Sequence, residues 1–295
     1  MNSIDVCKLY ARKNNDCYEY LVDHLTTTSI LSYTLYKALK RLYKPRYVVY
    51  SLIAGLLHDI GKAYLGFQRD KEKRSLSFKY HELLSYAIVS SIESSLRKSI
   101  KELFNINASL SMVEYESFIL RPIVFHHQGL RGITIIGERE AQRFIDKINR
   151  SKENINVIEK VIQESAYRTI NILSTLGYTE KEVFHILKSL TNIQMERIDI
   201  IRPGGGIVKD EEVVEESRTI TGLLMLADNL ATAINMPLPC VEQRLITLEA
   251  AYVVRTILYD KSANLPKEWC NKVEAVIEQW LQGKETAVPT SAPSS

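Results

Sequence analysis

The stretch Leu56-Leu57-His58-Asp59-Ile60-Gly61-Lys62 decides how this chain can fold and what it can bind. It places an imidazole, His58, beside a carboxylate, Asp59, at the end of an apolar run that we expect to be a central buried helix, Arg46 to Leu57. One divalent ion can take both side chains as ligands, and the carboxylate keeps a second oxygen for another ion. Lys62 then returns a cation to the rim, where it can meet a phosphate oxygen or Asp59 itself. A metal site is the interpretation that this stretch favours.

The other histidines of the N-terminal half strengthen this interpretation. His24 falls on the inner face of an amphipathic helix, and His81 falls on the inner stripe of another helix at its first turn. The pair His126-His127 closes an apolar segment, and two adjacent buried rings would each need their own partner if they served only packing. His185, in contrast, is expected to be an ordinary residue of a helix.

Asp228 completes the candidate set. It lies on the inward stripe of a predicted helix, and an aspartate is rarely buried unless it is paired or holds a metal ion. Two sets of four ligands that share one bridging carboxylate need about seven residues. The chain offers that number: His24, His58, Asp59, His81, His126, His127 and Asp228. Several independent core histidines would be the less economical explanation.

Helical periodicity and the breaks in it predict an all-α chain. We expect helices at Tyr18 to Lys44, Arg46 to Leu57, from His81 onward, Tyr115 to Phe125, Glu138 to Ser151, 153–174, 179–190, about Glu211 to Asn235, near 241–259 and at 267–282. We expect loops at 68–79 and Ile200 to Lys209. Residues 1–284 are predicted to form a single domain, and 285–295 a disordered tail.

Composition limits where the protein works. The N-terminus lacks the apolar core of a signal peptide, and no apolar run reaches about eighteen residues, so we expect a cytoplasmic protein with no membrane partner. The cysteines form no C-x-x-C pair, and we expect them to be free thiols: Cys7, Cys17, Cys240 and Cys270.

Charge is divided unevenly along the chain. Residues 1–150 carry 23 Lys and Arg against 15 Asp and Glu, a balance of +8, whereas residues 151–295 carry 15 against 20, a balance of −5. A cationic half that also contains the metal-site histidines suits a polyanionic substrate. The candidate nucleic-acid contacts are Arg69, Lys71, Lys73 and Arg74 of the basic loop, Arg131, and Arg139 and Arg143 of a row that continues to Lys147 and Arg150. A solvated surface is the alternative for both groups.

The order His24, His58-Asp59, Lys62, His81, His126-His127, Asp228 resembles the HD-domain metal-dependent phosphohydrolase superfamily. Within it, the chain is most similar to the stand-alone HD nuclease of type I CRISPR interference systems, because of the paired histidines, the basic N-terminal half and the lack of a fused module. The resemblance covers most of residues 16–235 and implies an HD-domain helical bundle. The interval between His127 and Asp228 is long for this family, so 131–210 is predicted to be a helical insertion or lid.

The resemblance also implies roles for the candidate residues. One metal ion would be held by His24, His58, Asp59 and Asp228, and the other by Asp59, His81, His126 and His127. Lys62 would stabilise charge on the phosphate, beside the catalytic pair His58 and Asp59. One or two manganese, nickel, cobalt or iron ions suit this imidazole-rich set better than magnesium does.

The implied function is a nuclease of antiviral defence. It would cleave single-stranded DNA, or RNA, and work with a separate helicase and an RNA-guided surveillance complex. The alternatives are a cyclic-dinucleotide phosphodiesterase, whose usual Gly-Tyr-Pro after the paired histidines is missing here, and a nucleotide phosphohydrolase. A non-catalytic scaffold would not need the complete ligand set.

Overall fold

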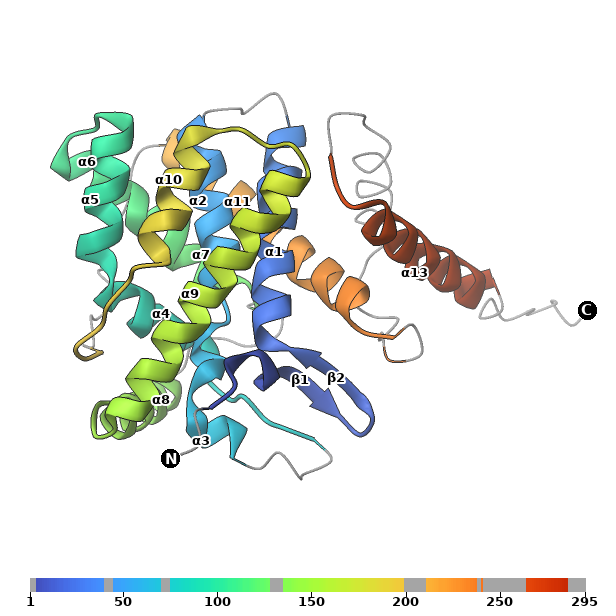
Figure 1. Ribbon diagram of the computed structural model, residues 1–295, viewed down its shortest axis with the longest axis horizontal. Helices are drawn as coiled ribbons and strands as arrows, with labels where there is room; N and C mark the ends of the chain where they lie inside the picture. Colours follow the sequence, from blue (N-terminus) through green and yellow to red (C-terminus); the bar gives the residue numbers. More distant parts are fainter. Residues whose placement is uncertain are drawn as a thin grey trace, which may run out of the picture.

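The computed structural model describes residues 4–39, 45–69, 75–127, 135–198, 211–237, 240 and 264–285. At its centre, α1 (Leu21–Ala38) packs against α2 (Pro45–Leu57), α9 (Lys152–Thr175) and α11 (Glu211–Asn235), as Figure 1 shows. Because it is surrounded, α1 is buried along nearly its whole length. A Cβ added at Gly55 would lie 2.8 Å from the Ser29 Cα, so glycine is what lets α2 cross α1 so closely.

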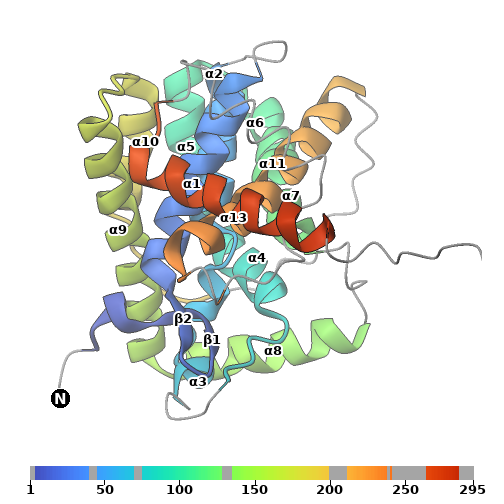
Figure 2. The same ribbon diagram turned by 90° about the vertical axis from the view of Figure 1, so that its right-hand side faces the viewer.

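Further helices surround this centre (Figure 2). In chain order they are η1 (Val6–Lys8), η3 (Ile60–Ala63), α3 (Leu65–Gln68), α4 (His81–Ser91), α5 (Glu93–Phe104), α6 (Ala108–Tyr115), η4 (Glu116–Leu120), α7 (Arg121–Phe125), α8 (Ile135–Asn149), α10 (Lys181–Leu190) and α13 (Lys267–Glu285). The predicted all-α class is confirmed. Among the described residues, no helix is long and apolar enough to cross a membrane.

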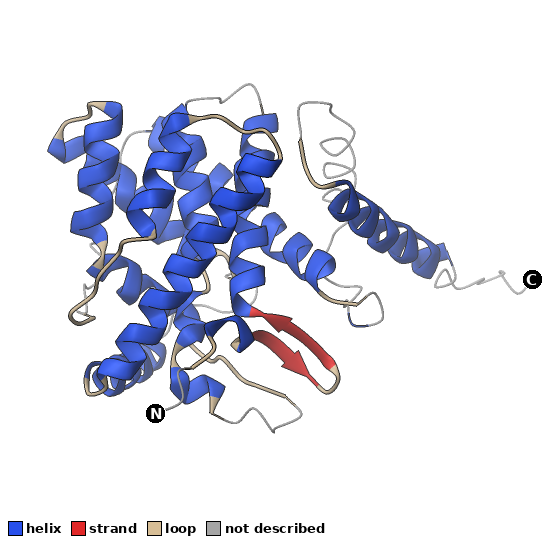
Figure 3. Cartoon of the chain, in the orientation of Figure 1, coloured by secondary structure: helices blue, strands red, loops and turns tan. Residues whose placement is uncertain are grey.

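One prediction about the N-terminus is wrong. Residues 18–20 are not helical but belong to a hairpin of β1 (Tyr10–Asn14) and β2 (Cys17–Tyr20), drawn in red in Figure 3. The turn places Asn15 at a φ of 52°, a left-handed conformation that asparagine tolerates. The expected helix therefore begins at Leu21 and ends at Ala38. The next helix, α2, begins at Pro45, one residue before the expected start, since proline suits the first turn of a helix.

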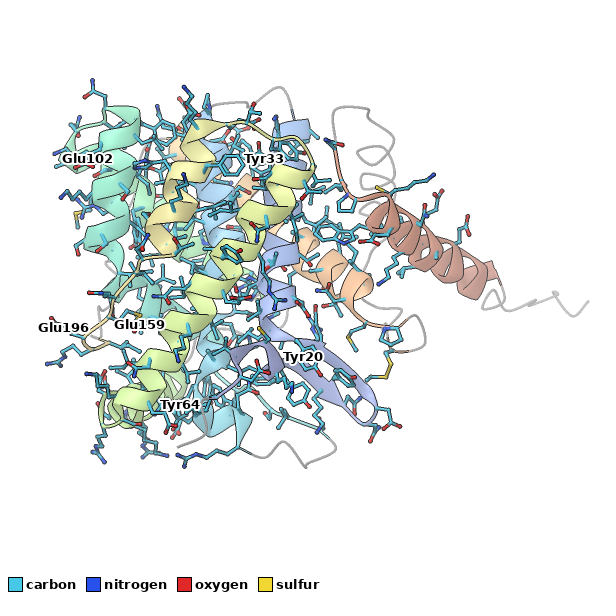
Figure 4. The ribbon with its side chains drawn as sticks, viewed as in Figure 1. Tyr20, Tyr33, Tyr64, Glu102, Glu159 and Glu196 are labelled. Atoms are coloured by element: carbon cyan, nitrogen blue, oxygen red, sulfur yellow. A yellow bond between two sulfur atoms is a disulfide. The ribbon has the colours of Figure 1, made fainter. Side chains whose placement is uncertain are left out.

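The expectation of four free thiols is also wrong. Cys17 and Cys240 form a disulfide, visible as the yellow bond beside the hairpin in Figure 4, whereas Cys7 and Cys270 are free. The Cα atoms of Cys17 and Cys240 are 5.5 Å apart although the residues are 223 positions apart in the chain. Distant cysteines can meet in this way without any C-x-x-C spacing, which is why cysteine spacing did not reveal the pair.

The segment predicted to be an insertion or lid contributes to the common core. Its helix α9 packs against α1 and buries Ile158, Val161 and Ile162 completely. Whether 131–210 is an insertion relative to other members of the family stays a prediction. The expected loop at 200–209, the helix near 241–259 and the tail beyond Glu285 lie outside the described residues.

Candidate metal centre

Five helical segments bring the candidate residues to one place. His24 projects from α1 and Asp228 from α11, while His81 is the first residue of α4. The two pairs follow helix ends, with His58-Asp59 after α2 and His126-His127 after α7. A helix end is required there, because neighbouring side chains on a continuing helix would diverge by about 100°.

The seven residues form two groups that share Asp59. In each group, one potential ligand atom from every residue lies within 4.8 Å of the others: His24, His58, Asp59 and Asp228 in the first, and Asp59, His81, His126 and His127 in the second. The two oxygens of Asp59 face different groups. Oδ2 lies 3.3 Å from His24 Nε2, whereas Oδ1 lies 2.9 Å from His81 Nε2. Asp59 is therefore placed to bridge two ions.

Four of the five histidines are held with the same ring nitrogen, Nε2, facing inward. Their Nδ1 atoms lie within hydrogen-bonding distance of an acceptor: the distance is 2.8 Å from His24 to Glu19, 2.9 Å from His58 to the Gly55 carbonyl, and 2.6 Å from His81 and His126 to the Phe78 and Ile123 carbonyls. A proton on Nδ1 leaves a lone pair on Nε2, and such a partner fixes both the tautomer and the ring orientation of a metal ligand.

Several of the inward atoms have no hydrogen-bond partner among the described residues. Asp59 Oδ1, His81 Nε2 and His126 Nε2 are all buried and make no hydrogen bond, because the 2.9 Å contact between Asp59 Oδ1 and His81 Nε2 lacks hydrogen-bond geometry. Leaving a buried polar atom unpaired costs about 1–3 kcal/mol, so a cluster of three calls for an explanation. A divalent ion that accepts all three as ligands provides one, and the donor set of nitrogen and oxygen atoms fits a transition metal.

The titration behaviour of the centre follows from its burial and its carboxylates. Burial alone would lower the pKa of His24, but Glu19, Asp228 and Asp59 raise that pKa well above its usual value. Burial, followed by the neighbouring His126, lowers the pKa of His127 to about 2. The pKa of Asp59 is held well below its usual range because Lys62 and the histidines outweigh the opposing effect of burial. Both Asp59 and His127 are thus in their metal-binding forms at neutral pH.

Lys62 and Gly61 hold the loop of the centre in place. The Lys62 ammonium lies 2.5 Å from Asp59 Oδ2. Of the two partners expected for Lys62, a phosphate oxygen and Asp59, it therefore contacts Asp59. A Cβ on Gly61 would lie 2.4 Å from the His81 carbonyl oxygen. Gly61 is therefore needed for the close approach of η3 to α4, and its backbone N–H donates to Ser85.

A pocket of about 700 Å³ opens beside the centre. Lys62, His81 and His127 line it, together with the basic residues Arg12, Lys13 and Lys79. Of the contacts predicted from the sequence, Arg69, Arg139 and Arg143 do not line this pocket, and Arg143 pairs with Glu140 instead. Lys71, Lys73, Arg74 and Arg131 lie outside the described residues. These seven residues stay predicted contacts for a longer substrate.

Two residues of the hairpin that reach the centre were not predicted from the sequence. Glu19 is buried and accepts the His24 hydrogen bond, and Arg12 extends to Asp228, with 3.4 Å between Nη2 and Oδ1. Arg12 and Glu19 face each other across the strands. The available signal was the turn sequence Asn14-Asn15-Asp16 followed by the alternation of Tyr18 and Tyr20.

A helical bundle that gathers histidines and carboxylates into two overlapping ligand groups defines a metal-dependent hydrolase. The chain belongs to the HD domain family, whose model matches residues 21–233. Members of this family are metal-dependent phosphohydrolases. No curated protein and no solved structure shows significant similarity to the chain.

Proposed function

We propose that this protein is a metal-dependent nuclease that hydrolyses phosphodiester bonds in single-stranded nucleic acid, with His24, His58, Asp59, His81, His126, His127 and Asp228 as its ligands. The observation that carries the proposal is the pair of ligand groups sharing Asp59 at the edge of a pocket with a basic lining. When bound, two divalent ions supply an activated water and neutralise charge on the phosphoryl oxygens.

The chain's own cations would orient the substrate. Lys62 contacts Asp59, Arg12 contacts Asp228, and both line the pocket. Their charges therefore lie where a substrate phosphate would enter, and a guanidinium can hold a phosphate through two hydrogen bonds. Lys13 and Lys79 extend this positive lining away from the centre, as a polymer with several phosphates would require.

The resemblance to the stand-alone CRISPR nuclease supplies the cellular part of the proposal. We infer a role in antiviral defence, in which a separate helicase and an RNA-guided surveillance complex deliver the single strand. The HD family and the imidazole-rich set support manganese, nickel, cobalt or iron as the ion.

A cyclic-dinucleotide phosphodiesterase is the second candidate. A pocket of about 700 Å³ has room for a ligand of that size, within the usual range for small-molecule sites. A polymer would instead have to leave the pocket and contact the surface beyond it, so cleavage of long single strands separates the two candidates.

The test is cleavage of end-labelled single-stranded DNA, RNA and a cyclic dinucleotide by the purified protein with manganese, with and without chelator. We expect chelator-sensitive cleavage of the polymer and loss of both bound metal and turnover in Asp59→Ala, because Asp59 serves both groups. His185→Ala is the matched control, since His185 is exposed on α10. Cleavage of the cyclic dinucleotide alone, or a His185→Ala protein as inactive as Asp59→Ala, would contradict the proposal.

A further inference from the structure

The hairpin of β1 and β2 presents two different faces. Cross-strand partners share a face of a sheet, and successive residues of a strand alternate between faces. Arg12 pairs with Glu19 and Asn14 with Cys17, and this inner face reaches Asp228, His24 and Cys240. On the other face, Tyr10 pairs with Tyr20 and Lys13 pairs with Tyr18. Tyr10 and Lys13 lie on the same side of the hairpin because the register shifts between Tyr10 and Arg12. We call Tyr10, Lys13, Tyr18 and Tyr20 the tyrosine face.

The rings of the tyrosine face form one cluster. Tyr10 and Tyr20 stack with their centroids 5.7 Å apart, and Tyr18 lies 6.0 Å from Tyr10 and 5.3 Å from Tyr20. The Lys13 ammonium lies 5.2 Å from the centre of the Tyr10 ring. Tyr18 is 45% exposed, whereas Tyr10, Lys13 and Tyr20 are half-buried, so the cluster reaches the solvent mainly through Tyr18.

The contacts that hold the hairpin against the rest of the protein do not explain why these aromatic rings lie at the surface. Leu9 and Ala11 are fully buried, the disulfide holds Cys17, and the Tyr10 backbone exchanges hydrogen bonds with the Gln68 side chain. These contacts fix the hairpin from its inner face and its base. A single exposed apolar side chain needs no explanation, but rings gathered into one cluster next to a candidate functional pocket are the kind of patch that marks an interaction site.

The tyrosine face is continuous with the pocket of the metal centre. Lys13 belongs to the face and also lines the 700 Å³ pocket with His81 and His127. On the other side, Tyr18 and Tyr20 line a recess of about 310 Å³ that Trp269 of α13 helps to close. The three carboxylates that line this recess, Glu19, Asp23 and Glu268, outnumber its one cation, Lys272, and this balance of charge disfavours a phosphate there. An uncharged aromatic group is therefore the better occupant of the recess.

We propose that the tyrosine face binds a single strand of nucleic acid as it enters or leaves the metal centre. A base stacks on the exposed ring of Tyr18, which packs against Tyr10 and Tyr20, while Lys13 and Arg12 contact the phosphates on the side of the pocket. Aromatic side chains beside cations are the usual means of binding single strands without sequence preference. The inference rests on the proposed nuclease function and adds a substrate-binding element, since the hairpin precedes residues 21–233, the part that matches the family.

The first test compares Tyr18→Leu with Tyr18→Phe in binding a fluorescently labelled oligo-dT or oligo-U. Loss of one stacked base should weaken binding about 5- to 100-fold in Tyr18→Leu, whereas Tyr18→Phe keeps the ring and should stay within about 3-fold of the wild type. Metal content and melting temperature show whether each variant is folded and loaded. Equal affinity of the two variants, or no binding of either oligonucleotide by the wild type, would overturn the proposal.

A second test observes stacking without any turnover. Tyr18→Trp places an indole on the tyrosine face, and its fluorescence should be quenched when oligo-dT binds. Met112→Trp is the matched control, because Met112 is 59% exposed on α6, at the other end of the bundle from the hairpin (Figure 1). Equal quenching at both positions would contradict the inference. Quenching at position 18 alone, in a protein that cleaves no polymer, would support the inference and refute the nuclease function.

Discussion

At the residue scale, the centre depends on which proton each imidazole carries. Glu19 accepts from His24 Nδ1 and also lies 3.7 Å from Arg12, so one buried carboxylate connects the hairpin to a ligand. Three further histidines use backbone carbonyls for the same purpose. The ring orientations of these four histidines are therefore supported by groups of the protein itself.

Glu19→Gln should lower metal affinity about 10- to 100-fold, the usual effect of losing a charged partner behind a metal-bound histidine. The glutamine keeps the size of the side chain and an acceptor oxygen, so the change mainly removes the negative charge behind His24. The measurement is calorimetric titration with manganese. Glu140→Gln serves as the control, since Glu140 lies on α8 and pairs with Arg143. Unchanged affinity in Glu19→Gln would show that Glu19 does not support the centre.

The raised pKa of His24 predicts opposite effects of pH on the metal-free and metal-loaded protein. When the pKa of a histidine is higher in the folded than in the unfolded state, its protonation stabilises the fold. This stabilisation is complete below the unfolded pKa of about 6.5 and is lost as pH rises through the folded pKa. The metal-free protein should therefore lose about 1.4 kcal/mol per pH unit between the two values. Metal competes with the same proton, so metal affinity should rise over this range.

Thermal unfolding of both forms at several pH values above 6.5 measures this prediction. Asp59 and Asp228 do not contribute in this window, because their pKa values are lowered from a reference that already lies far below it. A metal-free protein whose melting temperature rises with pH would show that His24 is not protonated in the absence of metal.

At the scale of elements, the helices that carry the ligands were predictable and the hairpin was not. The bounds expected for α2 and α11 match the structure within one residue, because a buried apolar stripe with a proline or glutamate at its start is a local signal. The segment at 18–20 continues the apolar pattern of α1, yet it becomes a strand because it pairs with residues 10–14. Strand pairing and the disulfide are contacts between distant residues, which periodicity does not report.

At the candidate site, too, the residues with a local sequence signal were predicted, and those that only the fold brings together were not. The local signals of His58-Asp59 and His126-His127 placed these residues at helix ends, where the structure has them. Arg12 and Lys13 were missed because nothing in their own neighbourhood distinguishes them from other surface cations, whereas Lys79 lies in the predicted basic loop at 68–79 but was not among its named contacts. Only the fold brings these side chains to the pocket.

Removing the disulfide should loosen the hairpin and destabilise the protein. Cys17→Ser is expected to cost about 2–5 kcal/mol in free energy of unfolding, since the bond closes a long loop of the unfolded chain. Cys270→Ser is the matched control because Cys270 is free. Chemical denaturation with and without reductant measures both variants. The difference between Cys17→Ser and the wild type should vanish under reductant; a difference that persists there would place the effect elsewhere than in the disulfide.

At the scale of the whole molecule, the two halves of the chain carry opposite charge and meet in one bundle. The basic half supplies the hairpin, most of the potential ligands and the cations that line the pocket, while the acidic half supplies Asp228 and the helices that cover α1. Such an arrangement steers a polyanion towards one side of the molecule. The field is screened by salt, so ionic strength is the variable that reveals which cations meet phosphates.

The salt dependence of single-strand binding tests whether the substrate extends beyond the pocket. Each phosphate contact contributes a slope of about −0.7 to the dependence of log affinity on log salt. If Arg69, Lys71, Lys73 and Arg74 all contact phosphates, changing them to glutamine should flatten the slope by up to about 2.8. Changing four exposed lysines of the acidic half, Lys152, Lys160, Lys181 and Lys188, alters net charge equally and is the control. Flattening by the same amount in both variants would mean that net charge alone governs binding, and no flattening in either would confine the substrate to the pocket, as expected for a cyclic dinucleotide.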